Sequence, residues 1–93
     1  MLVADIIEIA SQESGIAVAS IKSNSRHKSV IRPRHAAMYI ARNLLGMPYQ
    51  QLGRIFNRDH SSVIFAVKEA DKRIWRDEKF KDLVFRIYRE IET

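Results

Sequence analysis

Residues 58–68 read Arg-Asp-His-Ser-Ser-Val-Ile-Phe-Ala-Val-Lys, so five polar residues lead directly into an apolar segment with helical periodicity. Val63, Val67 and Ala70 recur at the spacing of one helix face, which Ile74 continues, and can point inward. Other residues of the segment fall largely on the remaining faces: Ser61, Ser62, Phe65, Lys68 and Lys72. The stretch predicts a helix that buries an apolar stripe and exposes a polar N-terminus.

A second, shorter helical pattern lies just upstream, at residues 49–56, with an apolar face made of Leu52, Ile55 and Phe56. Only Asn57 and Arg58 remain as a turn between the two patterns. Helix, tight turn and polar-tipped helix is the arrangement by which a helix-turn-helix presents a recognition helix to the major groove of DNA. Asp59 can cap the second helix through a side-chain oxygen.

Three short motifs resemble a known family. Residues 58–63 (RDHSSV), 32–34 (RPR) and 36–39 (AAMY) are similar to the C-terminal DNA-binding domain, domain IV, of the bacterial replication initiator DnaA. The resemblance covers nearly the whole chain and is strongest from about residue 25 to residue 73. It implies an all-α, compact five- to six-helix domain with a helix-turn-helix of the Trp-repressor-like type, binding DNA sites related to replication-origin initiator boxes.

This chain departs from the family pattern at a few positions that bear on the exact DNA sequence bound. Asn57 stands alone where the family often has a Gly-Gly pair, and Glu69 stands where a basic residue is common. Serine occupies positions 61 and 62, where threonine is frequent. No Gly-rich phosphate loop ending in Lys-Ser or Lys-Thr occurs, so we expect this domain to bind no nucleotide.

Length and composition indicate one helix-turn-helix domain over residues 1–93, large enough for a single modest core. Hydrophobic residues make up 46% of the chain and are spread along it, so no segment is expected to enter a membrane. The first residues do not form a basic-then-apolar secretion signal, and we expect a cytoplasmic protein. The absence of cysteine excludes disulfides and thiolate metal sites.

The net charge of +5 is unevenly distributed. Residues 1–13 carry three acids and no base, residues 14–58 carry eight bases and no acid, and basic and acidic residues are equally numerous from residue 59 onward. Each phosphate neutralised by Lys or Arg releases condensed counterions, so a polyanion is the natural partner of the middle segment. The alternative is a basic surface that serves solubility.

Candidate base contacts cluster at the start of the recognition helix. A carboxylate at Asp59 can accept a hydrogen bond from the N4 amino group of cytosine, and His60 can donate to a base acceptor or lie against a thymine methyl. Ser61 and Ser62 can bond a base edge or a phosphate. Arg26 lies in the polar segment 23–29, which is interpreted either as a surface loop or as an arm for the minor groove. The family resemblance implies the minor-groove role.

Candidate phosphate contacts surround a second helix, predicted over residues 33–45 because proline suits a first helical turn and Gly46 a helix end. Exposed N–H groups and flanking arginines favour a phosphate clamp there. The resemblance implies backbone contacts at three of these positions, Arg34, His35 and Arg42. The full predicted set is Lys28, Arg32, Arg34, His35, Arg42, Arg58 and Lys68.

The remaining apolar patterns predict the supporting helices. A first helix presents Val3, Ile6, Ile7 and Ala10 and ends at Ser14-Gly15, and a single turn follows at residues 19–22. The helix over 33–45 presents Ala37, Ile40, Ala41 and Leu44, and the last helix presents Phe80, Leu83, Val84, Ile87 and Ile91. Trp75 and Tyr88 are predicted at the rim of the core.

Other functions find less support in the sequence. Asp59, His60 and Ser61 are consecutive, so their side chains diverge by about a hundred degrees per residue and cannot form a hydrolase triad. The three histidines show no spacing typical of a metal site, and we expect no enzyme activity, metal or cofactor. The main alternative is a regulator that binds a full-length replication initiator or another helical partner through Tyr49, Phe65 and Trp75. RNA is less suitable, because its deep major groove excludes a helix.

Overall fold

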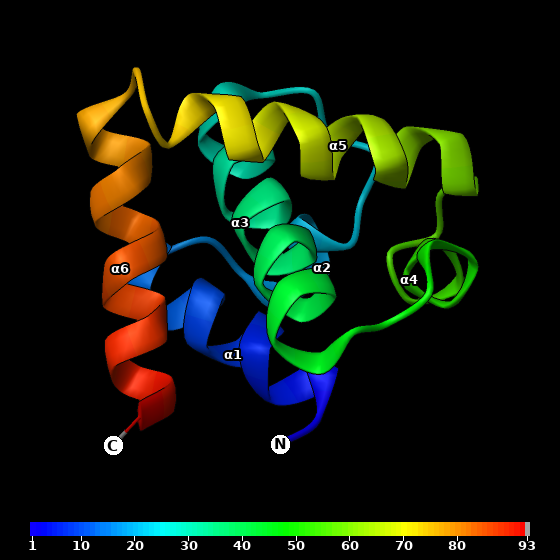
Figure 1. Cartoon of the computed structure of the whole chain (residues 1–93), viewed down its shortest axis with the longest axis horizontal. Helices are drawn as coiled ribbons and strands as arrows, with labels where there is room; N and C mark the ends of the chain where they lie inside the picture. The colour runs from blue at the N-terminus through cyan, green and yellow to red at the C-terminus, as the bar shows by residue number, and fades with distance from the viewer. Residues whose placement is uncertain (93) are drawn as a thin grey trace.

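Apolar residues at helical spacing build six helices in the computed structural model, which describes residues 1–92. The helices are α1 (Val3–Ser14), α2 (Val18–Ile21), α3 (Lys28–Leu45), α4 (Tyr49–Ile55), α5 (His60–Arg73) and α6 (Glu78–Glu92) (Figure 1). No strand occurs in this part of the chain. The all-α prediction with a helix-turn-helix, formed by α4 and α5, is therefore confirmed.

Helix α3 is the centre of the molecule and packs against α1, α5 and α6 (Figure 1). Three fully buried alanines, Ala36, Ala37 and Ala41, let the neighbouring helices approach closely, and Met38 and Ile40 fill the space around them. The core is one continuous cluster to which each of the six helices contributes. Helix α5 crosses near one end of α3 (Figure 1), and its buried stripe packs against that helix.

The apolar stripes predicted for α1, α5 and α6 are confirmed by burial. Val63, Val67 and Ala70 are buried on α5, while Ile74 lies half-buried just beyond the helix. On α1 and α6 the buried residues are Ile6, Ile7 and Ala10, and Phe80, Leu83, Val84 and Ile87. Gly15 ends α1 with a φ of 74°, in the left-handed region that glycine enters without a Cβ clash.

The predicted start of α3 at Pro33 was wrong, because the helix begins at Lys28 and contains Pro33 in its second turn. Val30 and Pro33 are both buried and continue the stripe of Ala37 toward the N-terminus, so the core extends the helix past the proline. The ring removes only the hydrogen bond to the carbonyl of Ser29, whose residue is exposed to water. Lys28 and Ser29 are consequently helical, not part of a loop.

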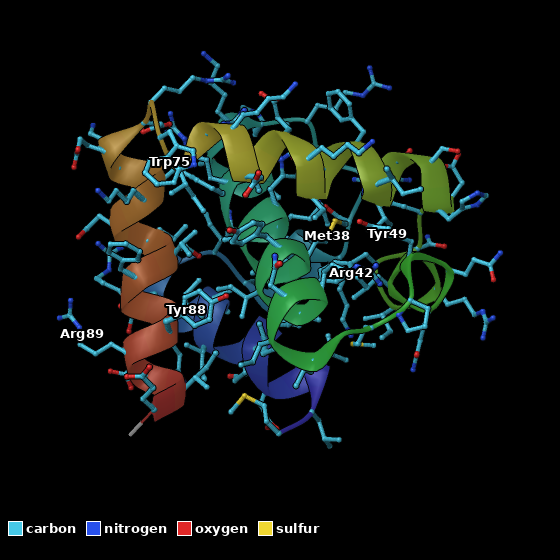
Figure 2. All side chains as sticks on the ribbon, viewed as in Figure 1. Met38, Arg42, Tyr49, Trp75, Tyr88 and Arg89 are labelled. Carbon is cyan, nitrogen blue, oxygen red and sulfur yellow. The ribbon has the colours of Figure 1, made fainter. Side chains whose placement is uncertain are left out.

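Two predictions about single apolar side chains also fail. Leu44 does not belong to the buried stripe of α3 and is 45% exposed, because Leu45 packs against the core in its place. Trp75 is not at the core rim but 83% exposed, at the corner between α5 and α6 (Figure 2). Tyr88, in contrast, is partly buried against the core as predicted.

The N-terminus and the C-terminal end of α6 lie at the end of the molecule opposite α5 (Figure 1). Within residues 1–92, no helix combines the length and apolar character needed to cross a bilayer.

Candidate nucleic-acid interface

The turn between α4 and α5 brings two backbones into direct contact. The N–H of Arg58 donates to the Gly53 carbonyl at 2.8 Å, and a Cβ on Gly53 would lie 2.5 Å from the Arg58 carbonyl oxygen. Asn57 completes the turn with a φ of 55°, a left-handed conformation that asparagine tolerates better than most residues. A single asparagine thus makes a turn for which the family pattern often has two glycines. This turn fixes the orientation of α5 relative to α4.

Asp59 caps the recognition helix, as predicted. Its Oδ1 accepts a hydrogen bond from the backbone N–H of Ser62 at 2.7 Å, while the residue remains exposed. This hydrogen bond lowers the pKa of the Asp59 carboxyl below its usual range. The carboxylate is therefore ionised at neutral pH, so it can accept hydrogen bonds from a ligand but cannot donate one.

The outer face of the first turns of α5 consists of His60, Ser61 and Ser62, all exposed. Phe65 follows one turn later and is 64% exposed, which places an apolar ring beside these polar groups. Lys68 continues the same exposed side of the helix. The arrangement offers hydrogen-bonding groups, an aromatic ring and a cation along one line, a set that suits a base-lined groove bordered by phosphates.

A hollow of about 440 Å³ separates the start of α5 from the loop that precedes α3, and we call it the recognition groove. It brings the predicted contacts Arg26, Asp59, Ser61 and Ser62 together although the chain separates the first from the others by more than thirty residues. His60 instead lines a neighbouring hollow of about 490 Å³, beside Arg54 and Asn57. The lining of the recognition groove is Ser25, Arg26, Ile31, Arg34, His35, Met38, Arg58, Asp59, Ser61, Ser62, Phe65 and Ala66.

Arg34 is not an exposed phosphate ligand, contrary to the sequence prediction. It is 2% exposed, and its guanidinium donates from Nε to the Ile21 carbonyl at 2.7 Å, from Nη1 to Ser25 at 2.9 Å and from Nη2 to Ser20 at 3.3 Å. Burial, and then the neighbouring Arg58, lower its pKa to about 10, so it stays charged at neutral pH. Arg34 holds the segment that carries Arg26 onto α3.

Arg58 fixes the same segment from the other side. Its Nη2 donates to the Ser23 carbonyl at 3.0 Å, and its buried Nε has no hydrogen-bond partner within residues 1–92. Since Arg58 immediately precedes the cap of α5, this contact ties the recognition helix to the loop with Arg26. Two arginines thereby set the width of the recognition groove before any ligand binds.

Arg42 organises the connection between α3 and α4. It donates from Nη1 to the Met47 carbonyl at 2.8 Å, and its guanidinium lies 4.2 Å from the centre of the Tyr49 ring. Figure 2 shows Arg42 on α3 and Tyr49 on α4 facing each other. The half-buried guanidinium is engaged within the protein, so any phosphate contact would share it with these groups.

His35 lies half-buried in the floor of the recognition groove. Its Nδ1 is buried and has no hydrogen-bond partner among the described residues. Burial first, and then the charges of Arg73, Arg34 and Arg58, lower its pKa to about 4. The imidazole is neutral at physiological pH and can therefore contact an anion only through an N–H, without a positive charge.

Lys28 and Arg32 belong to a second basic surface, which lies next to Arg26 and outside the recognition groove. Lys28 is exposed at the first position of α3, and Arg32, one turn later, lies 3.5 Å from Asp77. Three residues that the sequence did not single out face them across this surface: Arg73, Arg76 and Lys79. These three residues recur at a regular spacing of three in the sequence. Because acids and bases are equally numerous from residue 59 onward, the net charge of that part of the chain did not indicate a basic surface.

Comparison with known proteins agrees with this architecture. The family described as "Bacterial dnaA protein helix-turn-helix" matches residues 3–70, a range that includes α1 through nearly all of α5.

Several individual relatives are named chromosomal replication initiator protein DnaA. The chain is 42% identical over 73 residues to that of Wolbachia pipientis wMel, covering 77% of this chain and 16% of the relative. It is 38% identical over 79 residues to that of Citrifermentans bemidjiense, covering 84% and 17%, and 35% identical over 79 residues to that of Mycoplasma pneumoniae, covering 85% and 18%. The chain thus spans less than a fifth of the length of these relatives. On the evidence of its helix-turn-helix and these matches, the chain belongs to the bacterial DnaA helix-turn-helix family.

Proposed function

We propose that this chain binds double-stranded DNA sequence-specifically, with the N-terminal turns of α5 in the major groove and Arg26 in the adjacent minor groove. The target is a site related to the initiator boxes of bacterial replication origins, and the role lies in replication initiation or its regulation. Membership in the DnaA family and the names of the relatives support this role. Direct base contacts come from Arg26, Asp59, His60, Ser61 and Ser62.

The observation that carries the proposal is the recognition groove. Arg26 and the polar start of α5 line one hollow, in which Arg58 ties the two walls together and Arg34 holds the segment with Arg26 on α3. A preformed site avoids the entropic cost of ordering its contacts when DNA binds. The N-terminus of a capped recognition helix beside a basic loop also has the form that helix-turn-helix proteins with a minor-groove arm use.

Phosphate contacts divide into two groups under this proposal. Lys28, Arg32 and Lys68 are exposed or half-exposed and contact the backbone directly. Arg34, Arg42 and Arg58 act chiefly by holding backbone carbonyls of the protein in place. His35 contributes a neutral N–H at most. Of these two groups, the first should contribute to the salt dependence of binding and the second should not, since counterion release requires a cation placed at a phosphate.

A fluorescence-anisotropy titration tests the proposal. Duplexes with an initiator box, a scrambled box and random sequence are compared at 50 and 200 mM salt. We expect tighter binding to the box at both concentrations. Equal and strongly salt-dependent affinity for all three duplexes would reduce the protein to a nonspecific DNA binder. No binding to any duplex would contradict the proposal and favour a protein partner.

A further inference from the structure

A second basic surface, which we call the flank hollow, adjoins the recognition groove. It has a volume of about 820 Å³ and is assembled from three segments: the loop before α3, the first turns of α3 and the corner between α5 and α6. Its lining consists of Arg26, Lys28, Ile31, Arg32, Arg73, Arg76, Asp77, Glu78 and Lys79. Six of these nine residues are basic and two are acidic, so the surface favours an anion.

Ion pairs within the protein occupy part of this positive charge. Arg32 lies 3.5 Å from Asp77, and Glu69 lies 2.5 Å from Arg76 and 3.8 Å from Arg73. The side chains of Arg32 and Arg76 are 39% and 58% exposed, and ion pairs with such exposure contribute little to stability. A phosphate can therefore replace a carboxylate at these guanidinium groups at small cost. Lys28 and Lys79 are exposed as well.

The flank hollow is continuous with the recognition groove. Arg26 and Ile31 line both hollows, so one basic side chain stands at their common border. A duplex whose minor groove receives Arg26 must carry its sugar-phosphate backbone past this border. Beyond the recognised bases, the backbone on the Arg26 side would then run along the flank hollow.

We propose that the flank hollow binds the DNA backbone beyond the recognised bases, with Arg76 and Lys79 contacting phosphates together with Lys28 and Arg32. This inference rests on the proposed function and adds DNA contacts on one side of the recognition groove, next to Arg26. Because phosphate contacts carry no sequence information, the hollow adds affinity without changing specificity. Glu69 opposes this binding, since it competes with phosphate for Arg73 and Arg76.

The rival explanation is that the cluster only stabilises the corner between α5 and α6. The two explanations predict different DNA affinities for Glu69→Gln. If the hollow binds phosphate, this variant frees two guanidinium groups, so affinity for extended DNA should rise about threefold and the salt slope should steepen. If the ion pairs are purely structural, the variant lowers the melting temperature and leaves DNA affinity unchanged.

The experiment compares three duplexes: the box alone, the box extended by ten base pairs at one end, and the box extended at the other end. Wild type should gain affinity from one extension only. Arg76→Gln should lose that gain. Between 50 and 200 mM salt, the affinity of wild type should fall by a factor about threefold larger than the affinity of Arg76→Gln, since one lost phosphate contact lowers the slope by roughly 0.9. Lys79→Gln should behave in the same way.

Arg89→Gln is the matched control, because it removes the same charge from an exposed position of α6 far from the corner (Figure 2). Identical binding by Arg76→Gln and Arg89→Gln on every duplex would overturn the inference. A box preference in wild type that survives this result would leave the proposed function intact. If wild type showed no preference for the box over the other duplexes, the proposed function itself would be contradicted.

Discussion

Arg34 shows how far the role of one side chain can differ from what its neighbours in the sequence indicate. RPR at residues 32–34 resembles a basic motif for phosphate, yet its second arginine is buried and bonds three carbonyls of residues 20–25. A guanidinium has five N–H donors in a rigid fork and can therefore connect several carbonyls that a lysine could not reach together.

Replacement of Arg34 by alanine should consequently act on folding first. We expect Arg34→Ala to lower the free energy of unfolding by about 3 kcal/mol, because it leaves the buried carbonyl of Ile21 and the partly buried carbonyl of Ser25 without this donor. Urea denaturation measures this loss. Arg54→Ala, at an exposed position, is the control and should stay within about 0.5 kcal/mol of wild type. If Arg34→Ala kept full stability and only weakened DNA binding, the structural role assigned to this arginine would be wrong.

His60 permits the complementary test, because it is exposed and lies outside the core. We expect His60→Ala to cost about 1–3 kcal/mol of binding free energy on an initiator box and little on random DNA, as for a base-contacting residue. Lys68→Ala should weaken both complexes alike. Anisotropy titrations on the two duplexes provide the comparison. Equal losses on both duplexes for His60→Ala would remove it from the base-contacting set.

At the scale of elements, the helix-turn-helix depends on the close approach of Gly53 to Arg58. In most helices Gly→Ala stabilises by up to about 1 kcal/mol. Here the added methyl would lie 2.5 Å from a backbone oxygen, so α4 and α5 would have to move apart.

We therefore expect Gly53→Ala to destabilise the domain by about 1–3 kcal/mol and to weaken DNA binding, because α5 would follow the turn at an altered angle and displace one wall of the recognition groove. Gln50→Ala, on the same helix, should be neutral or slightly stabilising. Thermal unfolding and anisotropy measure the two effects. A Gly53→Ala protein as stable as wild type would show that the turn can relax without cost.

Most elements were predictable, and the exceptions have physical causes. Periodicity and the glycines located α1, α5, α6 and the end of α3, since burial of one face dominates each. The start of α3 was misplaced, because the burial of Val30 outweighs one hydrogen bond lost at Pro33. Trp75 follows Ile74 directly, and only the geometry of the corner decides that the smaller side chain is covered.

At the scale of the whole molecule, charge arranged in space differs from charge counted along the chain. Residues 59–92 contain as many acids as bases, yet the fold gathers Arg73, Arg76 and Lys79 beside Lys28 and Arg32. The polar start of α5 was predictable from the sequence, because one short run, residues 58–63, carries it, whereas half of the residues that line the recognition groove come from residues 25–38. The flank hollow could not be found in this way, since its walls meet only after α3 and α5 have packed.

The stability of the folded domain should depend on pH through His35. Its pKa falls from 6.5 to about 4 on folding, so the unfolded chain binds more protons between these values and stability is lost as pH decreases through this window. We expect a loss of at most about 2 kcal/mol between pH 7 and pH 5, reduced by partial exposure to solvent. Urea unfolding at both pH values measures it.

His35→Gln should remove this part of the pH dependence, because glutamine does not titrate. His27→Gln, at an exposed position, should retain it. An equal decrease in stability for wild type and His35→Gln would assign the pH dependence to other groups.

The position of the two chain ends has a practical consequence. The N-terminus and the end of α6 both lie opposite α5. A fluorescent protein or a surface tether attached at either end would project away from bound DNA and would not compete with it for space. The same chain could thus be immobilised or labelled at either end, so single-molecule force or energy-transfer measurements could follow it on a duplex without blocking its contacts.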